Sequence, residues 1–182
     1  LGVQPLPPDL RSPLELLPRP VVVIQPGGSG WTPNKQWPIE RWRSLIRELL
    51  PRASVVEVGT DPLFPPNEFG PRFVNLSGRT SVIEFAAAIR DADLFIGQAS
   101  AGMHLAGAFE TPSIVIFGGY EHPNGIGYKQ MVPFYTQLPC APCWLTTPCP
   151  YQHACMTAIE VADLRSTAFR LLDLPRTPWQ PG

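Results

Sequence analysis

Residues 93–109 read DLFIGQASAGMHLAGAF, and this stretch decides how the rest of the chain is interpreted. Its apolar start, 93–96, is typical of a buried strand, and 101–109 is typical of a helix. The turn between them is rich in small side chains, so a ligand can approach the backbone there. The first N–H groups of a helix lack partners and carry the positive end of its dipole. The stretch therefore predicts a site for a diphosphate or another anion.

Four residues of this turn are candidates for contacting the anion. Ser100 is expected to be the N-cap of the helix, with Ala101 and Gly102 in its first turn. His104 falls on the same turn, so a ring nitrogen could point at the ligand. The alternative is structural, because small residues also occur at tightly packed turns and a lone histidine often has only a structural partner. The neighbouring sequence has to decide between the two.

Strands and helices alternate on both sides of this stretch. The run 21–24 (VVVI) is typical of a strand buried on both faces of a parallel sheet. Further strands are predicted at 54–58, 72–75 and 113–117, and helices at 39–50, 81–90 and 159–172. In the helix 81–90, Val82, Phe85, Ala86 and Ile89 are expected to face inward. The alternation predicts an α/β fold, a Rossmann-like doubly wound parallel sheet.

Proline divides the chain into segments. Residues 1–20 contain six of the 24 prolines and are interpreted as a linker, followed by one domain at 21–174 and a tail at 175–182. Within the domain, 118–157 shows no periodicity and is expected to be a long irregular loop that carries all four cysteines. The first residue is leucine, so the chain is interpreted as a piece of something longer.

The composition excludes several classes of function. The chain has 182 residues, 44% of them hydrophobic and 16% charged, which suits one domain with a core. A net charge of -1 gives no reason to expect a nucleic acid partner. The sequence has no transmembrane segment and no signal peptide, so we expect a cytoplasmic protein.

Ligands of doubly wound sheets bind beyond the carboxyl ends of the strands. This rule brings four loops, 27–29, 59–61, 76–80 and 98–104, to one edge of the predicted sheet. We therefore expect these loops to share a single crevice. A Rossmann oxidoreductase is disfavoured, because GGSG at 27–30 does not fit the glycine pattern that follows the first strand in that class.

The motifs along this edge resemble those of the ADP-heptose:lipopolysaccharide heptosyltransferases, glycosyltransferase family 9. The resemblance rests on VIQPGGS at 23–29, NKQWP at 34–38 and NLSGRT at 75–80, together with 97–106 and 112–118. It implies the C-terminal half of a bacterial GT-B enzyme, which binds a nucleotide-diphosphate-sugar donor such as ADP-heptose for transfer to a glycan or protein acceptor. The family's N-terminal domain holds the acceptor and supplies the catalytic base. We expect that domain on the same or another chain, since nothing here corresponds to it.

The resemblance also implies roles for individual residues. Ser29 and Lys35 match the positions that contact the diphosphate, and a lysine after a glycine-rich turn can neutralise phosphate charge. The resemblance places Ser77, Gly78 and Thr80 under the nucleobase. Asp61 lies near the family's acidic residue on the ribose, with Glu57 as a competitor. Ala99 departs from the family, which has an aspartate at this position.

The four cysteines form a separate cluster. Cys140, Cys143, Cys149 and Cys155 are separated by two, five and five residues. Such spacing favours a structural zinc or iron ion, and His153 could replace one ligand. Reduced thiols or two disulfides are the alternatives. The cluster resembles that of the heptosyltransferases that modify autotransporter proteins and carry a cysteine-bound iron.

Two functions of different classes follow. The favoured one is donor binding in a glycosyltransferase, without an organic cofactor. The alternative is a metal-stabilised interaction module in which the sugar-nucleotide site is vestigial.

Overall fold

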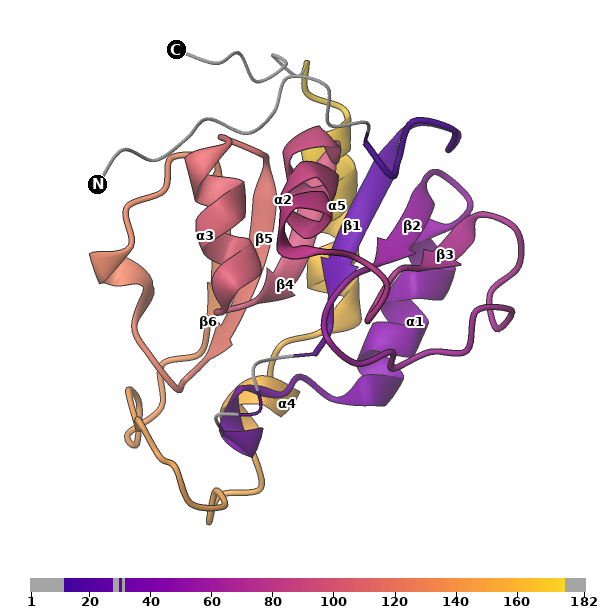
Figure 1. Cartoon of the computed structure of the whole chain (residues 1–182). Coiled ribbons are helices and arrows are strands. Elements are labelled where there is room, and N and C mark those ends of the chain that lie inside the picture. Colours follow the sequence, from indigo (N-terminus) through magenta and orange to yellow (C-terminus); the bar gives the residue numbers. More distant parts are fainter. Residues whose placement is uncertain (1–11, 28–29, 31, 176–182) are drawn as a thin grey trace.

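The computed structural model describes residues 12–27, 30 and 32–175. Its centre is a six-stranded sheet in the order β3-β2-β1-β4-β5-β6, in which every neighbouring pair is parallel (Figure 1). This is the order of a Rossmann-like doubly wound sheet, so the predicted fold class is confirmed. The strands are β1 Val21–Gln25, β2 Ser54–Glu57, β3 Phe73–Asn75, β4 Leu94–Gln98, β5 Ser113–Gly118 and β6 Met131–Tyr135.

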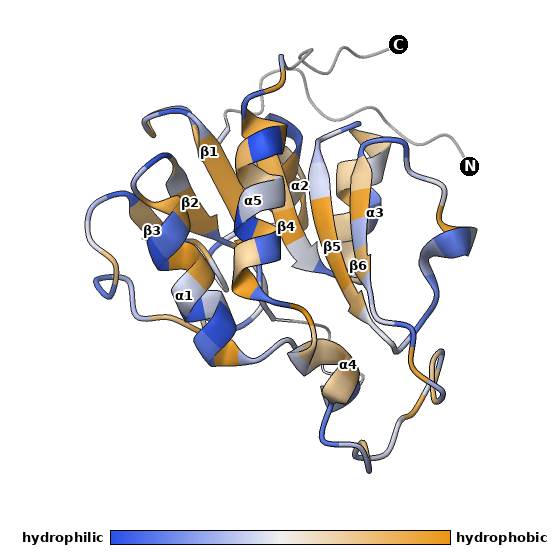
Figure 2. Cartoon of the chain, turned by 180° about the vertical axis from the view of Figure 1, so that it is seen from behind, coloured by the Kyte–Doolittle hydropathy of each residue, from blue (hydrophilic) through white to orange (hydrophobic). Residues whose placement is uncertain are grey.

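Helices cover both faces of the sheet. One face carries α1 and α5, and the other carries α2 and α3, as Figures 1 and 2 show from opposite sides. None of the helices in the described part of the chain is long and apolar enough to cross a membrane. The helices are α1 Ile39–Leu49, α2 Val82–Asp91, α3 Ala101–Ala108, α4 Ala154–Thr157 and α5 Val161–Leu172, with 3-10 turns η1 Pro33–Lys35 and η2 Pro123–Gly125.

The central strands are buried on both faces, as their apolar sequences predict. Successive side chains of a strand point to opposite faces. Val22 therefore packs in the core that includes Trp42 of α1 and Leu164 of α5. Val23 packs in a second core with Ile89 of α2. Burial on both faces explains why these strands lack an alternating polar pattern.

The prediction that 118–157 is irregular is wrong for β6 and for the short helix α4. β6 pairs with β5 as the sheet's edge strand, and it is only half-buried. Pro133 interrupts its pattern, and proline is tolerated there because an edge strand has one side without ladder hydrogen bonds. A short edge strand containing proline carries too weak a periodic signal to be recognised from the sequence.

The segment before β1 packs against the sheet. Leu14 is fully buried in the same core as Val21, and the Ser54 hydroxyl donates to the carbonyl of Pro18 at 2.6 Å. The described end of the predicted linker, from residue 12, therefore contributes to the core of the domain.

Candidate functional site

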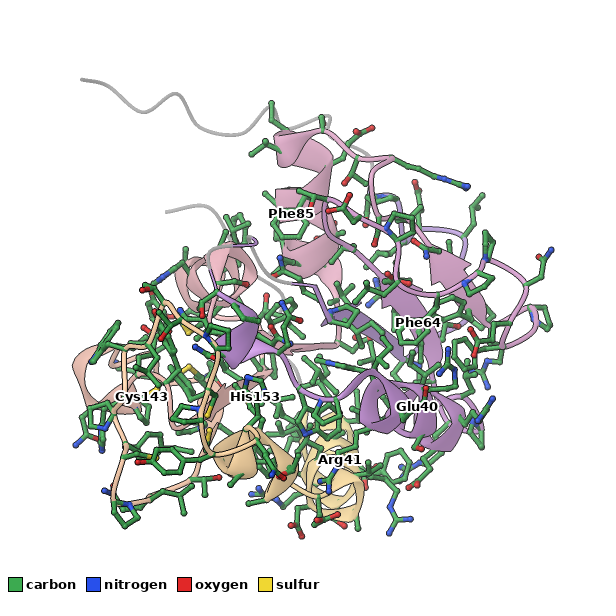
Figure 3. All side chains as sticks on the ribbon, turned by 90° about the horizontal axis from the view of Figure 1, so that it is seen from below. Glu40, Arg41, Phe64, Phe85, Cys143 and His153 are labelled. Carbon is green, nitrogen blue, oxygen red and sulfur yellow. The ribbon has the colours of Figure 1, made fainter. Side chains whose placement is uncertain are left out.

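A cleft of about 240 Å³ opens at the carboxyl edge of the sheet. It lies at the switch point between β1 and β4. After β1 the chain continues to β2 on one side, and after β4 it continues to β5 on the other side. The predicted loops 59–61, 76–80 and 98–104 all contribute to it, so their meeting at one edge is confirmed. Figure 3 looks at this edge from below. The lining residues are Gln25, Gly27, Gly59, Thr60, Thr80, Ser81, Val82, Phe85, Ser100 and Ala101.

One end of the cleft is the N-terminus of α3. Ser100 is the N-cap by position, but its hydroxyl donates to Gln25 Oε1 at 2.9 Å and does not cap the helix. Among the described residues, no side chain caps this first turn. A Cβ on Gly102 would lie 2.2 Å from Gln25 Oε1 and 2.7 Å from Phe95 Cζ, so glycine is required for this close packing. The turn thus has the uncapped, positively polarised backbone that an anion needs.

The other end of the cleft is more apolar. Val82 is 81% exposed and lines the cleft beside Phe85, so the prediction that Val82 faces inward is wrong. It is the first residue of α2, where a side chain has no neighbouring turn to pack on. Phe85 is half-buried and lies at this end in Figure 3. Together with Thr80, these side chains form a wall suited to a flat, partly apolar group.

The loop under this wall is fixed by backbone contacts. Gly78 has a φ of +70°, its N–H donates to the carbonyl of Gly59 at 2.8 Å, and a Cβ there would lie 3.0 Å from the carbonyl oxygen of Thr60. This conformation favours glycine. The contact locks the loop after β3 onto the loop after β2. Both loops therefore hold a fixed position beside the cleft.

Glu57 is a buried hub rather than a free carboxylate. It accepts hydrogen bonds from the Leu63 N–H at 2.7 Å, Asn75 Nδ2 at 2.7 Å and the Ser77 hydroxyl at 3.2 Å. Burial raises the pKa of this carboxyl, although the hydrogen bonds from Leu63 and Ser77 oppose the rise. The Ser77 side chain is thus directed to Glu57. Asp61 is exposed, accepts from the Thr60 hydroxyl at 3.1 Å and does not line the cleft.

Lys35 does not line the cleft itself but lies beside the turn that leads into α3. Its Nζ lies 3.3 Å from the carbonyl oxygen of Ala99 and 2.5 Å from Glu121 Oε1. The same ammonium stands 4.7 Å from the centre of the Tyr120 ring. Its side chain is 24% exposed, so a ligand can still reach the charge.

Sequence reasoning missed Glu121. It supplies a carboxylate beside Lys35, near Ala99. Ala99 stands at the position where the family has an aspartate, so Glu121 is a carboxylate in the same region. Its signal was its place in the loop after β5, three residues beyond Gly118, because the carboxyl end of that strand lies at the same edge as the other loops.

His104 does not face the cleft. Its Nδ1 lies 2.8 Å from the Tyr128 hydroxyl, and the two rings meet edge to face with centres 5.9 Å apart. Tyr128 also packs against Gly107, where a Cβ would lie 2.4 Å from its ring. The structure thus favours the structural alternative for His104. Ser29 lies outside the described residues.

The cysteine-bearing segment is attached to the segment that carries Lys35. Asn34 is 3% exposed, and its Nδ2 donates to the carbonyls of Leu145 at 2.8 Å and Thr147 at 2.7 Å. Its Oδ1 lies 2.9 Å from His153 Nε2. Figure 3 shows His153 and Cys143 on the side of the edge away from Phe85. One buried asparagine therefore joins this segment to η1, the turn that carries Lys35.

The four cysteines are half-exposed free thiols. Within the described residues, no three histidine, cysteine or acidic side chains are placed to hold one metal ion, so the observed arrangement does not form the predicted ligand set. Cys143, Cys149 and Cys155 are nevertheless near enough to influence one another. Burial raises the pKa of Cys155, and the nearby Cys143 and Cys149 raise it further.

The strand order, the cleft at the switch point and the uncapped helix N-terminus define a Rossmann-like domain with a candidate anion-binding cleft. The family model for glycosyltransferase family 9 (heptosyltransferase) matches residues 7–153. The chain therefore belongs to glycosyltransferase family 9. Curated protein sequences gave no match.

Solved structures with the same fold include three glycosyltransferases. ADP-heptose lps heptosyltransferase II of E. coli has a TM-score of 0.67 at 20% identity, over 85% of this chain and 46% of that one. The iron-containing dodecameric heptosyltransferase TibC of enterotoxigenic E. coli H10407, in complex with ADP-D-beta-D-heptose, has a TM-score of 0.68 at 24% identity. The match covers 90% of this chain and 47% of that one. The family 9 glycosyl transferase of Veillonella parvula DSM 2008 has a TM-score of 0.66 at 18% identity, over 84% of this chain and 46% of that one. The chain spans about half the length of each.

Proposed function

We propose that this chain binds the nucleotide-diphosphate-sugar donor of a heptosyltransferase, ADP-heptose or a close relative. The observation that carries the proposal is the cleft at the β1/β4 switch point, with the uncapped turn of α3 at one end and Lys35 next to it. A helix N-terminus and a lysine together offer directed N–H donors and a point charge, which suits a diphosphate. Membership of glycosyltransferase family 9 supports the same assignment.

The cleft orients the donor. The nucleoside lies at the apolar end formed by Thr80, Val82 and Phe85, and the diphosphate lies at Ser100 and Ala101 within reach of Lys35. The hydrogen bond from the Gly78 N–H to the Gly59 carbonyl holds the two loops in place at the nucleoside end. In this arrangement His104 and Asp61 do not contact the donor.

Transfer requires an acceptor site and a catalytic base, and we assign both to a further domain. The chain spans about half of the enzymes it resembles, which supports this division of roles. One of those structures is a complex with ADP-D-beta-D-heptose, which supports a donor of the same class here. The residues described above bind and orient the donor, and the acceptor domain would carry out proton removal. A reducing, cytoplasmic location in a bacterium fits the four free thiols.

Calorimetric titration with ADP, UDP and GDP tests the donor assignment. The proposal predicts saturable binding of one nucleotide per chain, with ADP preferred. A protein that binds none of the three would refute donor binding and favour the alternative, an interaction module with a vestigial site.

We also propose a structural zinc or iron ion on Cys140, Cys143, Cys149 and Cys155. Two of the cysteines lie against Gly119, which supports it: the Cys143 N–H donates to the Gly119 carbonyl, and a Cβ on Gly119 would lie 3.0 Å from Cys155 Cβ. Binding would need the thiol side chains to turn toward one ion, because they do not form a ligand set as they stand. The ion would offset the entropy of ordering the segment, and four protein ligands leave no open position for chemistry.

Elemental analysis should find about one equivalent of zinc or iron per chain. The thiols should resist modification until a chelator is added, because a metal-bound thiolate is shielded from the reagent. Metal-free protein with fully reactive thiols would contradict this part of the proposal.

A further inference from the structure

Trp144 is a large aromatic side chain that is exposed on the surface. It is 58% exposed, although burying a tryptophan is strongly favourable. Its φ of +49° lies in the left-handed region, which is uncommon for a bulky residue and costs free energy. The Trp144 N–H donates to the carbonyl of Tyr120 at 3.2 Å, and the Cys143 N–H donates to the carbonyl of Gly119 at 3.1 Å. The surrounding backbone therefore fixes an unfavourable conformation that presents the ring to solvent.

The ring is connected to the diphosphate lysine through one residue. Trp144 and Tyr120 meet edge to face with their centres 5.4 Å apart. The buried Tyr120 ring in turn lies 4.7 Å from Lys35 Nζ. Lys35, Tyr120 and Trp144 thus form a continuous series from the ammonium to the surface.

The order of the strands gives this series a direction. The nucleoside end of the cleft is built from loops after β2 and β3, and the α3 turn follows β4. Tyr120 follows β5, on the opposite side of β4 from those loops. Trp144 therefore lies beyond the diphosphate position, away from the base. In a nucleotide-diphosphate sugar, the group attached at that end is the sugar.

We propose that Trp144 is the stacking platform for the sugar of the donor, with Tyr120 supporting its ring. This inference rests on the proposed donor function and adds a sugar subsite to it. An aromatic ring presents an apolar face, and a sugar ring carries patches of C–H groups that pack against such a face. The adjacent hydrogen bonds to Tyr120 and Gly119 fix the platform before the donor arrives, which reduces the entropy lost on binding.

Comparing ADP with ADP-heptose tests the platform, because only the second ligand carries the sugar. Trp144→Ala should lower the affinity for ADP-heptose about tenfold, the loss expected for one aromatic contact. The affinity for ADP should stay within about twofold, because Trp144 does not line the nucleotide cleft. Trp144→Phe should retain most of the ADP-heptose affinity.

Tyr151 provides a matched control. It is an aromatic residue of the same segment with the same exposure, 58%, and Tyr151→Ala should leave both affinities unchanged. Equal losses for ADP and ADP-heptose in Trp144→Ala, or no loss for ADP-heptose, would overturn the sugar platform while leaving donor binding intact. Failure of the unmodified protein to bind ADP would refute the proposed function and the platform with it.

Discussion

Lys35→Ala should lower the affinity for ADP by about 10- to 100-fold while the fold is retained. A charge-assisted hydrogen bond contributes about 1.5–3 kcal/mol, which corresponds to this range. The fold should persist because Lys35 is partly exposed and is the last residue of the 3-10 turn η1, outside the core. Calorimetry measures the affinity, and thermal unfolding monitors the fold.

Lys129 is the matched control for this substitution. It is the chain's other lysine, it is exposed, and it does not line the cleft. Lys129→Ala removes the same net charge, so it should change ADP affinity only slightly. If both variants lost affinity equally, the effect would come from overall charge and Lys35 would not be a diphosphate residue.

Glu121→Gln should have the opposite effect on the same site. The carboxylate neutralises Lys35 at 2.5 Å and repels an incoming phosphate. Its neutral amide analogue should raise ADP affinity up to about fivefold, the equivalent of a partly exposed ion pair of about 1 kcal/mol. Unchanged or weaker binding would show that Glu121 does not compete with the ligand.

Asn34→Ala should release the cysteine-bearing segment from the domain. The substitution removes the two hydrogen bonds to the carbonyls of Leu145 and Thr147 and the contact with His153. At about 1 kcal/mol for each buried hydrogen bond, the segment loses roughly 2–4 kcal/mol. Limited proteolysis should then show new cleavage between 136 and 157. The six-stranded sheet has its own cores and should still unfold cooperatively.

Asn124 is the control for this experiment. It is an exposed asparagine in η2, and Asn124→Ala should not change the cleavage pattern. Because Asn34 adjoins Lys35, the Asn34 variant should also bind ADP more weakly. An unchanged cleavage pattern in Asn34→Ala would mean that other contacts hold the segment.

The sequence predicted the fold well because the central strands are buried on both faces. Runs such as 21–24 and 113–117 must be apolar and β-branched in such a sheet, and these patterns are local. β6 was missed because an edge strand requires little burial and tolerates Pro133. What a strand packs against determines its sequence signal, so the edge of the sheet was the least predictable part.

The site was predictable to the extent that it depends on chain direction. All carboxyl ends of a parallel sheet lie at one edge, so loops 59–61, 76–80 and 98–104 could be placed together from the order of elements alone. The direction of a side chain could not be predicted in this way. His104 contacts Tyr128, and Lys35 contacts Glu121, 24 and 86 residues away along the chain. Such partners are brought together only by tertiary structure.

The most direct test of donor binding follows the backbone amides of isotopically labelled protein during an ADP titration. We expect the largest chemical-shift changes at the cleft, at Gly59, Thr80, Ser100 and Ala101. A second hollow at the same edge, lined by residues that include Trp37, Trp42 and Gln152, should respond weakly. Changes centred on that second hollow, or no changes at saturating ADP, would contradict the claim that this domain binds a nucleotide-diphosphate donor at the β1/β4 switch point.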